Sequence, residues 1–368
     1  MTVSEMRADL AAALAENNEK CIRCGLCVRK CEFLMRYGNP GDIATGYDAE
    51  TAGDMPFKCS QCGLCGAVCP ERLQPAKMFL AMRRQAVDRA EAPYRAHKSI
   101  LNYERRGISK PYTFEGLPQG CRTVFFPGCS LPGTRPATTI KLIEMLEEKV
   151  KNLGVVLHCC AKPSHDLGMQ DRFEAAFIPL RDRLLTAGVK TVLTACPNCH
   201  KVFSAYGGEL QVKSVYEELS NIGFKKIRRS ERYEFCVHDS CVVREEAGIQ
   251  KSVRDILKSM GHKVTGMKNE GYNTICCGEG GAVAFVDKSL ARAWTQKRAA
   301  QAKNRKMVMY CAGCHGFLSS KVKAFHLADL IADPENAHRR KPKVSGPPFT
   351  YLNRWRLVRK MQKKFPSS

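Results

Sequence analysis

The 368-residue chain has no long apolar run, and this absence limits where the protein can reside. A helix that spans a bilayer needs about 20 consecutive apolar residues, so no transmembrane helix is predicted. No apolar stretch follows Met1 that would form a secretory signal, because residues 2–20 are rich in alanine and acidic residues at helical spacing. We therefore expect a cytoplasmic protein in a reducing compartment, where 20 cysteines indicate metal binding rather than disulfides.

Motifs for nucleotides and nucleic acids are also missing. The chain contains no G-x-G-x-x-G, so we expect no bound flavin or nicotinamide. The glycine-rich turn 278–281 lacks the Lys-Ser/Thr of a P-loop and is better explained as a tight turn. The formal charge is +23, but no helix-turn-helix, zinc-finger or aromatic RNA-binding signature accompanies it, so we expect no nucleic-acid partner.

Eight cysteines form two tandem runs with the spacing C-x2-C-x2-C-x3-C. The first run is Cys21, Cys24, Cys27 and Cys31, and the second is Cys59, Cys62, Cys65 and Cys69. Two-cluster ferredoxins have this spacing, and in them the fourth cysteine of each run ligates the cluster of the other run. The spacing thus predicts one 4Fe-4S cubane on Cys21, Cys24, Cys27 and Cys69 (the first cubane set). It predicts another on Cys59, Cys62, Cys65 and Cys31 (the second cubane set).

Zinc is the main alternative for cysteines at such spacing. Zinc sites use paired C-x2-C units with four ligands, and a triple with a trailing fourth cysteine does not suit that geometry. The second run ends in Pro70, whereas Glu32 follows the first run, which leaves the ligands unaffected. Each cubane with four thiolates carries about two negative charges, so two cubanes lower the charge from +23 to about +19. Part of the basic balance therefore compensates for cofactors.

The pattern beyond the cysteine runs indicates an α+β protein with a helical N-terminal domain at residues 1–110. Residues 75–106 have helical composition, and glycines and prolines between 107 and 120 indicate a linker. Short apolar runs then alternate with helix-length segments, as in α/β domains. The predicted strands are 123–126, 155–157, 191–194, 233–237, 272–275 and 307–310. The predicted helices are 137–152, 172–187, 245–260 and 289–303.

Ten further cysteines form two sets of five at matching intervals. The first set is Cys129, Cys159, Cys160, Cys196 and Cys199, with 29 and 35 residues between its three parts. The second set is Cys241, Cys276, Cys277, Cys311 and Cys314, with 34 and 33 residues between its parts. Matching intervals imply a duplicated unit, with one repeat at residues 120–225 and the other at 226–335. Each strand before these cysteines ends near one of them, where open α/β sheets bind cofactors.

Both sets resemble the paired CCG motifs of the heterodisulfide reductase B and D subunits. The segments around Phe126–Cys129 and His238–Cys241 are also similar to that family. The same arrangement occurs in the glycolate oxidase iron-sulfur subunit, the anaerobic glycerol-3-phosphate dehydrogenase C subunit and lactate-utilisation iron-sulfur proteins. With the ferredoxin run, the resemblance covers nearly the whole chain before the tail.

The resemblance implies a noncubane 4Fe-4S cluster at each set of five, which we name the first and second CCG sites. It also implies that disulfide chemistry occurs at these clusters. The candidate catalytic residues are then the second set, Cys241, Cys276, Cys277, Cys311 and Cys314. Ala161 departs from the glycine that follows the cysteine pair in the family motif. If the backbone there needs a positive φ, the first site is strained, so the second site is the safer assignment.

Four other residues near the motifs have competing explanations. His200 and His315 complete C-x-x-C-H, a haem-attachment pattern, but haem attachment requires export. We expect them to donate to cluster sulfur or to a substrate disulfide, with helix capping as the alternative. Cys121 and Cys236 lie outside both sets, and we expect them to be buried structural thiols.

The last segment, 336–368, is a basic tail. Residues 337–348 are predicted to be a linker, and a helix follows with an apolar stripe at Trp355, Leu357, Val358, Met361 and Phe365. Arg354 interrupts that stripe. A basic amphipathic helix suits a membrane interface or an acidic groove on a partner, and a solvated tail is the alternative.

Two functions remain open from the sequence. In the first, the chain is an iron-sulfur electron-transfer subunit that relays electrons between a flavoprotein dehydrogenase and a quinone or other acceptor. It would then be cytoplasmic or peripheral on the inner face of the membrane. In the second, it is a catalytic thiol/disulfide reductase subunit, so whether the chain is itself an enzyme stays undecided. An iron-sulfur sensor is disfavoured because no DNA-binding module is visible.

Overall fold

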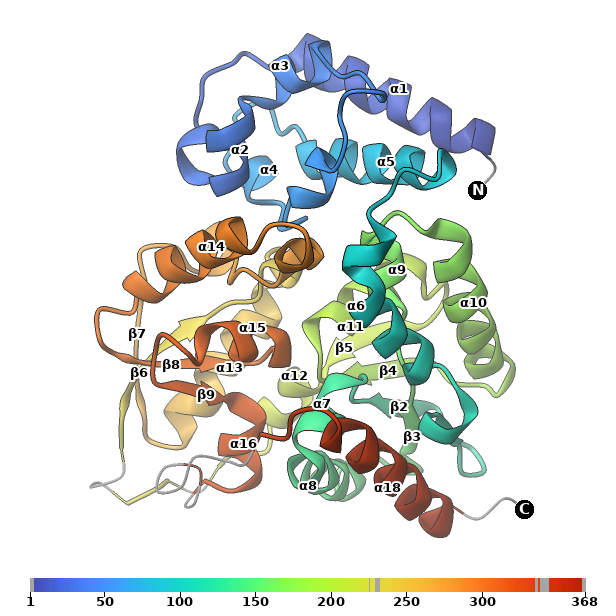
Figure 1. The fold of residues 1–368 in the computed structure, drawn as a ribbon. Helices are drawn as coiled ribbons and strands as arrows, with labels where there is room; N and C mark the ends of the chain where they lie inside the picture. Colours follow the sequence, from blue (N-terminus) through green and yellow to red (C-terminus); the bar gives the residue numbers. More distant parts are fainter. Residues whose placement is uncertain (1–2, 225, 229–231, 335–336, 338–343, 366–368) are drawn as a thin grey trace.

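Three bodies are arranged around the cysteine motifs in the computed structural model, which describes residues 3–224, 226–228, 232–334, 337 and 344–365 (Figure 1). A helical N-terminal domain lies above two α/β repeats that stand side by side. The α+β class, with a ferredoxin-like domain before a duplicated α/β unit, is confirmed. In the described part, no helix combines the length and the apolar character needed to cross a bilayer.

The N-terminal domain is built from helices around the two cysteine runs. Long helices α1 (Val3–Lys20) and α5 (Pro75–Asp88) pack against each other. Three short helices lie between them in sequence: α2 (Glu32–Tyr37), α3 (Pro40–Thr45) and α4 (Leu64–Ala67). Helix α3 begins where Asn39 accepts a hydrogen bond from the Asp42 amide and Pro40 occupies the first helical position. Leu10, Phe33 and Phe79 are buried in the core between these helices.

Each repeat contains a parallel sheet with the same strand order. The first sheet runs β3-β2-β4-β5 and carries an additional antiparallel strand, β1, beside β3. The second sheet runs β7-β6-β8-β9. The strands of the first sheet are β1 (Phe114–Gly116), β2 (Thr123–Phe126), β3 (Gly154–Leu157), β4 (Thr191–Thr194) and β5 (Gln211–Ser214). Those of the second are β6 (Glu234–His238), β7 (Lys263–Thr265), β8 (Lys306–Met309) and β9 (Ala324–His326).

Helices of matching position flank the two sheets. In the first repeat they are α7 (Ser130–Thr134), α8 (Pro136–Glu147), α9 (Lys162–Asp166), α10 (Gln170–Thr186), α11 (Pro197–Tyr206) and α12 (Val215–Ser220). In the second they are α13 (Ala247–Ser259), α14 (Lys288–Ala300), α15 (Ala312–Leu318) and α16 (Leu327–Ala332). The predicted helices and five of the six predicted strands lie within a few residues of these elements.

One predicted strand is wrong. Residues 272–275 do not form a strand, because the segment is a 3-10 turn (Gly271–Asn273) followed by extended chain. The Asp239 carboxylate accepts a hydrogen bond from the Gly271 amide at 2.7 Å, and Thr274 Oγ1 donates to the Asp239 carbonyl at 2.8 Å. These bonds hold the segment over the end of β6, and β7 takes the sheet position instead.

Two helices outside the repeats complete the fold. Helix α6 (Tyr94–Gly107) connects the N-terminal domain to the first repeat. Helix α18 (Phe349–Lys364) lies against α7 and α8 of the first repeat (Figure 1). The predicted tail helix is therefore present, but its apolar stripe is not free. Leu357, Val358 and Met361 are at most 3% exposed and belong to the main core, whereas Trp355 is 40% exposed.

Candidate iron-sulfur sites

All twenty cysteines are free thiols, and eighteen of them fall in the four predicted sets. The first cubane set is partly accessible to solvent, with Cys24 exposed and the other three cysteines half-buried. Cys21, Cys24, Cys27 and Cys69 line one small cavity, which Cys65 also reaches. The fourth cysteine of the second run thus joins the first three of the first run. This is the exchange that the spacing predicts, and these ligand assignments remain predictions.

The second cubane set is buried. Cys31, Cys59, Cys62 and Cys65 belong to one core cluster. Burial raises the pKa of Cys65 well above its usual range, and the charges of Cys59, Cys31 and Cys62 raise it further. Four buried thiols that repel one another as thiolates need a compensating positive charge, which an iron-sulfur core supplies.

In the second CCG site Cys241 follows β6 and Cys311 follows β8, whereas Cys276 and Cys277 follow the 3-10 turn Gly271–Asn273. Sγ atoms of Cys277 and Cys314 are 3.2 Å apart, and hydrogen bonds also join Cys241 with Cys276 and Cys311 with Cys314. Hydrogen bonds with Cys276 and Cys314 lower the pKa of Cys277 to about 7, which favours the thiolate that binds metal. The residues therefore fit a cluster by donor type, contact and charge.

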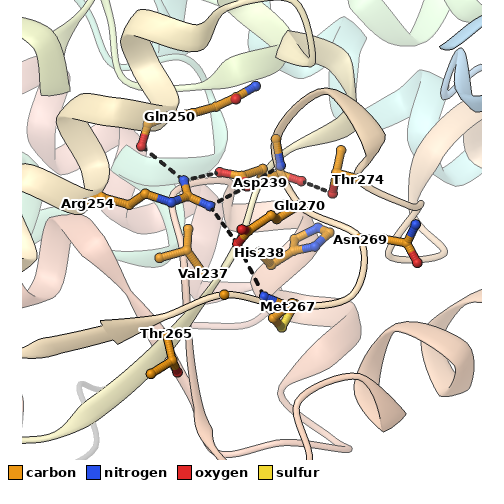
Figure 2. Close-up of polar contacts among 12 residues, drawn as sticks. Val237, His238, Asp239, Gln250, Arg254, Thr265, Met267, Asn269, Glu270 and Thr274 are labelled. Carbon is orange, nitrogen blue, oxygen red and sulfur yellow. Dashed lines mark hydrogen bonds and ion pairs between the residues drawn. The ribbon is translucent and has the colours of Figure 1, made fainter.

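A polar network fixes the loops of this site (Figure 2). Arg254 donates to both oxygens of the Asp239 carboxylate at 2.8 Å and to Glu270 at 3.4 Å. The Asp239 side chain is fully buried, so this bidentate ion pair contributes more than an exposed one. Asp239 lies two residues before Cys241, so the network positions the first cysteine of the site.

The first CCG site has the same contacts among its five cysteines. Sγ atoms of Cys160 and Cys199 are 3.4 Å apart, and hydrogen bonds join Cys129 with Cys159 and Cys196 with Cys199. The two sets therefore converge in the same way, as their matching intervals predict.

The two sites differ at the residue after the cysteine pair. Gly278 has φ +102°, a conformation that favours glycine, and a Cβ there would lie 2.5 Å from the Ala291 carbonyl oxygen. Ala161 occupies the matching position with φ +55°, so the backbone does require a positive φ. The first site therefore carries the strain that its alanine predicts, of about 1 kcal/mol.

Two residues from outside the repeat reach the first CCG site. Arg354 of α18 is 3% exposed, and its Nη2 donates to the Gly107 carbonyl at 3.2 Å. A Cβ on Gly107 would lie 2.9 Å from Cβ of Cys159, so the guanidinium sits beside this cysteine. A hydrogen bond from Cys159, the Arg354 charge and the Tyr103 hydroxyl lower the pKa of Cys129 to about 6. Arg354, which interrupts the predicted apolar stripe, thus lies at the first CCG site.

Buried arginines join the N-terminal domain to the second repeat. Arg244 donates to the Cys62 carbonyl at 2.8 Å, to the Thr274 carbonyl at 3.1 Å and to the Tyr272 carbonyl. Arg83 donates to the Cys59 carbonyl at 2.6 Å and, across the domain boundary, to the Gly281 carbonyl at 3.1 Å. Cys241 and Cys276 share a core cluster with the second cubane set. The second cubane set and the second CCG site are therefore direct neighbours.

The two C-x-x-C-H histidines do not contact a cysteine thiol in the described structure. His200 Nδ1 lies 3.2 Å from Thr194 Oγ1, and its Nε2 faces Glu246 at 3.9 Å. The His315 ring packs near His326, and burial lowers its pKa to about 4. A different histidine, His238, has a ring nitrogen within 4.8 Å of the Cys277 and Cys314 thiols. Sequence reasoning missed it, although its position three residues before Cys241 is a signal that could have identified it.

The remaining two thiols belong to neither set of five, although each shares a buried cluster with cysteines of one CCG site. Cys121 and Cys236 are buried, and they donate to the Thr123 and Lys306 carbonyls at 3.4 and 3.5 Å. These contacts suit the structural role predicted for them.

A large cavity of about 1060 Å³ opens between the N-terminal domain and the repeats. Cys62 and Cys241 line it, and so do Lys201 and the linked pair His165 and Tyr206. His165 Nε2 lies 2.9 Å from the Tyr206 hydroxyl. The cavity thus gives small molecules a route to the boundary between the second cubane set and the second CCG site.

Comparison with known proteins finds one family match in the N-terminal domain and another in the two repeats. Residues 17–73 match the 4Fe-4S dicluster domain, and residues 123–204 and 235–319 match the cysteine-rich CCG domain. EtfAB:quinone oxidoreductase of Syntrophomonas wolfei is 20% identical over 284 residues, which are 68% of this chain and 39% of that protein. The chain therefore aligns with well under half of that relative's length.

Other relatives align over more of their length. A dihydromethanophenazine:CoB–CoM heterodisulfide reductase polypeptide of Methanosarcina barkeri, the D component of that enzyme, is 22% identical, over 79% of this chain and 85% of that polypeptide. An uncharacterized iron-sulfur protein of Methanocaldococcus jannaschii is 22% identical, over 84% of this chain and 70% of its own length. Among solved structures, an aspartate racemase of Picrophilus torridus covers 64% of the chain at 16% identity. Its TM-score of 0.26 is too low to support an argument.

Proposed function

Because the chain is a CCG-domain iron-sulfur protein like the B and D components of heterodisulfide reductase, we propose that it is the electron-relay subunit of an oxidoreductase complex. It would carry electrons between a flavoprotein dehydrogenase and a quinone or another acceptor. The similarity to an EtfAB:quinone oxidoreductase supports this electron-relay role. Iron-sulfur clusters, when bound, supply one-electron transfer.

One observation carries the proposal: the second cubane set and the second CCG site share one buried core. Arg244 ties the Cys62 carbonyl to the 272–274 segment that leads into Cys276 and Cys277. A buried guanidinium with several carbonyl partners holds the two domains in a fixed relation, because loosening it would leave those partners unsatisfied. This arrangement gives a short path between two redox sites.

We assign ligands and domains on the same basis. The two cubane sets would hold cubanes within domain 1–110, and the two sets of five would hold noncubane clusters within repeats 120–225 and 226–335. The second CCG site, with its unstrained Gly278, is the better terminal site.

Rapid-freeze-quench electron paramagnetic resonance (EPR) after mixing with dithionite tests the relay. The signal of the second CCG site should appear after that of the second cubane set. Cys62→Ser should slow its appearance at least about tenfold, whereas the matched Cys24→Ser in the first cubane set should leave this last transfer unchanged. Equal rates of appearance in the wild type and in Cys62→Ser would contradict the relay.

The cavity supports a second candidate, a thiol/disulfide reductase. Reduction of an organic disulfide consumes two electrons and two protons and yields two thiols, so the substrate must reach a reducing site. Lys201 faces this cavity, and it has no hydrogen-bond or ion-pair partner among the described residues. Lys201 is exposed to the cavity, and partial desolvation there lowers its pKa, as does the charge of Lys162. A free cation here suits an anionic substrate.

An assay with dithiodiglycolate, a disulfide with two carboxylates, tests this candidate. Reduced wild-type protein should yield thiol, and Lys201→Met should raise KM while kcat changes little. Lys190→Met, an exposed lysine at the start of β4, serves as the control. If the fully reduced protein releases no thiol from this disulfide, the reductase function is refuted and only the electron-relay function remains.

The exposed face of α18 supports a peripheral attachment. Phe349, Leu352 and Trp355 are 61%, 38% and 40% exposed at a spacing of three residues, and the exposed cations Arg356 and Arg359 follow. We propose that this face, rather than the buried stripe, meets an anionic membrane surface. Full-length protein should co-sediment with vesicles of phosphatidylglycerol at low salt and be released by high salt. Unchanged binding by Trp355→Ala would contradict this.

A further inference from the structure

His238 lies at the end of β6 (Figure 2) and is 1% exposed. Its ring is close to Cys277 and Cys314 of the second CCG site. Its Nδ1 is 2.8 Å from Nε of Arg298, which is itself fully buried. Arg298 also donates to the Asn269 carbonyl, to Gln301 Oε1 at 2.9 Å and to the Val237 carbonyl at 3.4 Å. The guanidinium is therefore held in place by backbone as well as by the imidazole.

This contact determines the tautomer of His238. A guanidinium has five N–H donors and no acceptor, so Nδ1 must accept the hydrogen bond with its lone pair. Burial lowers the pKa of Arg298 to about 10, and it stays protonated at neutral pH. Because Nδ1 uses its lone pair to accept from Arg298, it carries no proton. The ring is therefore neutral with its single proton on Nε2.

That Nε2–H group has no hydrogen-bond partner among the described residues, although it is buried. A buried donor without a partner costs about 1–3 kcal/mol. A ring nitrogen of His238 lies within 4.8 Å of Sγ of both Cys277 and Cys314. The sulfur atoms of the second CCG site are thus the nearby acceptors.

The first repeat lacks this group. Cys129 and Cys241 are matching cysteines, and three residues earlier Phe126 stands where the second repeat has His238. The first CCG site instead has the permanent cation Arg354 beside it. The duplicated sites therefore differ in the polar group that each offers to sulfur.

We propose that His238 is a neutral N–H donor to a sulfur of the second CCG site and not an iron ligand, with Arg298 as the positioning residue that enforces this role. A nitrogen ligand needs a free lone pair, and the tautomer places the proton on the only nitrogen that Arg298 leaves unoccupied. Hydrogen bonds to sulfur are among the factors that set cluster potentials, because they stabilise the more negative reduced state. This inference rests on the proposed cluster at the second CCG site.

Pulsed EPR on full-length, anaerobically purified protein tests the role without any variant. With 15N-histidine, the signal of the second CCG site should show only the weak nitrogen coupling of a hydrogen-bonded imidazole. A proton coupling that disappears in deuterated water should accompany it. A strong coupling from directly bound nitrogen would overturn the inference, and so would the absence of any exchangeable proton coupling.

Redox titration of variants gives a second, independent readout. His238→Phe, which copies the first repeat, should weaken electron affinity at the second CCG site at least about tenfold, equivalent to 59 mV for one electron. His238→Gln keeps an N–H at a similar reach and should restore most of the affinity. The matched control His262→Gln alters a buried histidine at the opposite end of the sheet and should change nothing.

His238→Phe leaves Arg298 without its acceptor, so the double variant His238→Phe/Arg298→Met is included to keep the fold. If the reduction potential of the second CCG site is unchanged in the single and the double variant, the donor role of His238 is overturned but the assignment of the site is not. A wild-type protein with iron only for the cubanes and no signal from this site would overturn both the inference and the assignment of the site.

Discussion

The C-terminal helix α18 gives the sharpest test of how this chain folds. Leu357 is 2% exposed and lies in the main core, whereas Leu352, five residues earlier on the same helix, is 38% exposed. The same substitution, leucine to alanine, therefore removes a buried side chain at one position and a partly solvated one at the other. Alanine has at least the helix propensity of leucine, so any large loss comes from packing.

The expected size follows from burial. Truncation of a buried leucine costs about 2–5 kcal/mol, and Leu357 is packed in the main core on a helix that contacts α7 and α8. Leu352→Ala should change stability by less than about 0.5 kcal/mol. If α18 opens as a unit, a loss of about 2–5 kcal/mol in its opening free energy speeds its amide hydrogen exchange about 30- to 5000-fold.

Hydrogen-exchange mass spectrometry of peptides covering 349–364 measures this directly on the cluster-loaded protein. Leu357→Ala should exchange much faster than the wild type, and Leu352→Ala should not. Equal exchange in the two variants would refute the packing argument. Exchange at the rate of an unfolded peptide in the wild type would show that the tail is solvated.

Three further predictions concern the cysteine sites. Anaerobically purified protein should contain about 12 irons per chain with the two cubanes and the second CCG site filled, or about 16 with all four; about eight would remove the CCG clusters and stoichiometric zinc would remove all of them. Cys277→Ser should spare the cubane EPR signals and abolish terminal transfer, whereas Cys24→Ser should disturb one cubane; unchanged turnover in Cys277→Ser would make the second site structural. Ala161→Gly should raise the free energy of unfolding by up to about 1 kcal/mol in denaturant titration, because glycine adopts a positive φ without strain. Gly278→Ala should lower it by more than that, and the same change in both variants would contradict the backbone argument.

Local spacing predicts the cysteine sets, because cluster ligands must lie at fixed distances along tight turns. The duplication and the main strands also followed from the sequence, since the buried parallel strands β2, β4 and β8 each contain two or three consecutive apolar residues. The edge strands β5 and β7 were missed because they are short and partly exposed, so their sequences carry little apolar signal. The strand proposed at 272–275 failed because Asp239, distant in sequence, holds that segment.

Only the tertiary structure decided which sites are neighbours. Nothing in the spacing of Cys62 and Cys276 says that they share a core, because Arg244 and long-range packing bring them together. The role of α18 was likewise hidden, since an amphipathic stripe is the same whether it faces a membrane or its own core. His238 became a site residue through its contact with Arg298, 60 positions away in the chain. Ligand spacing is a local property of the backbone, whereas the surroundings of each ligand come from contacts between distant segments.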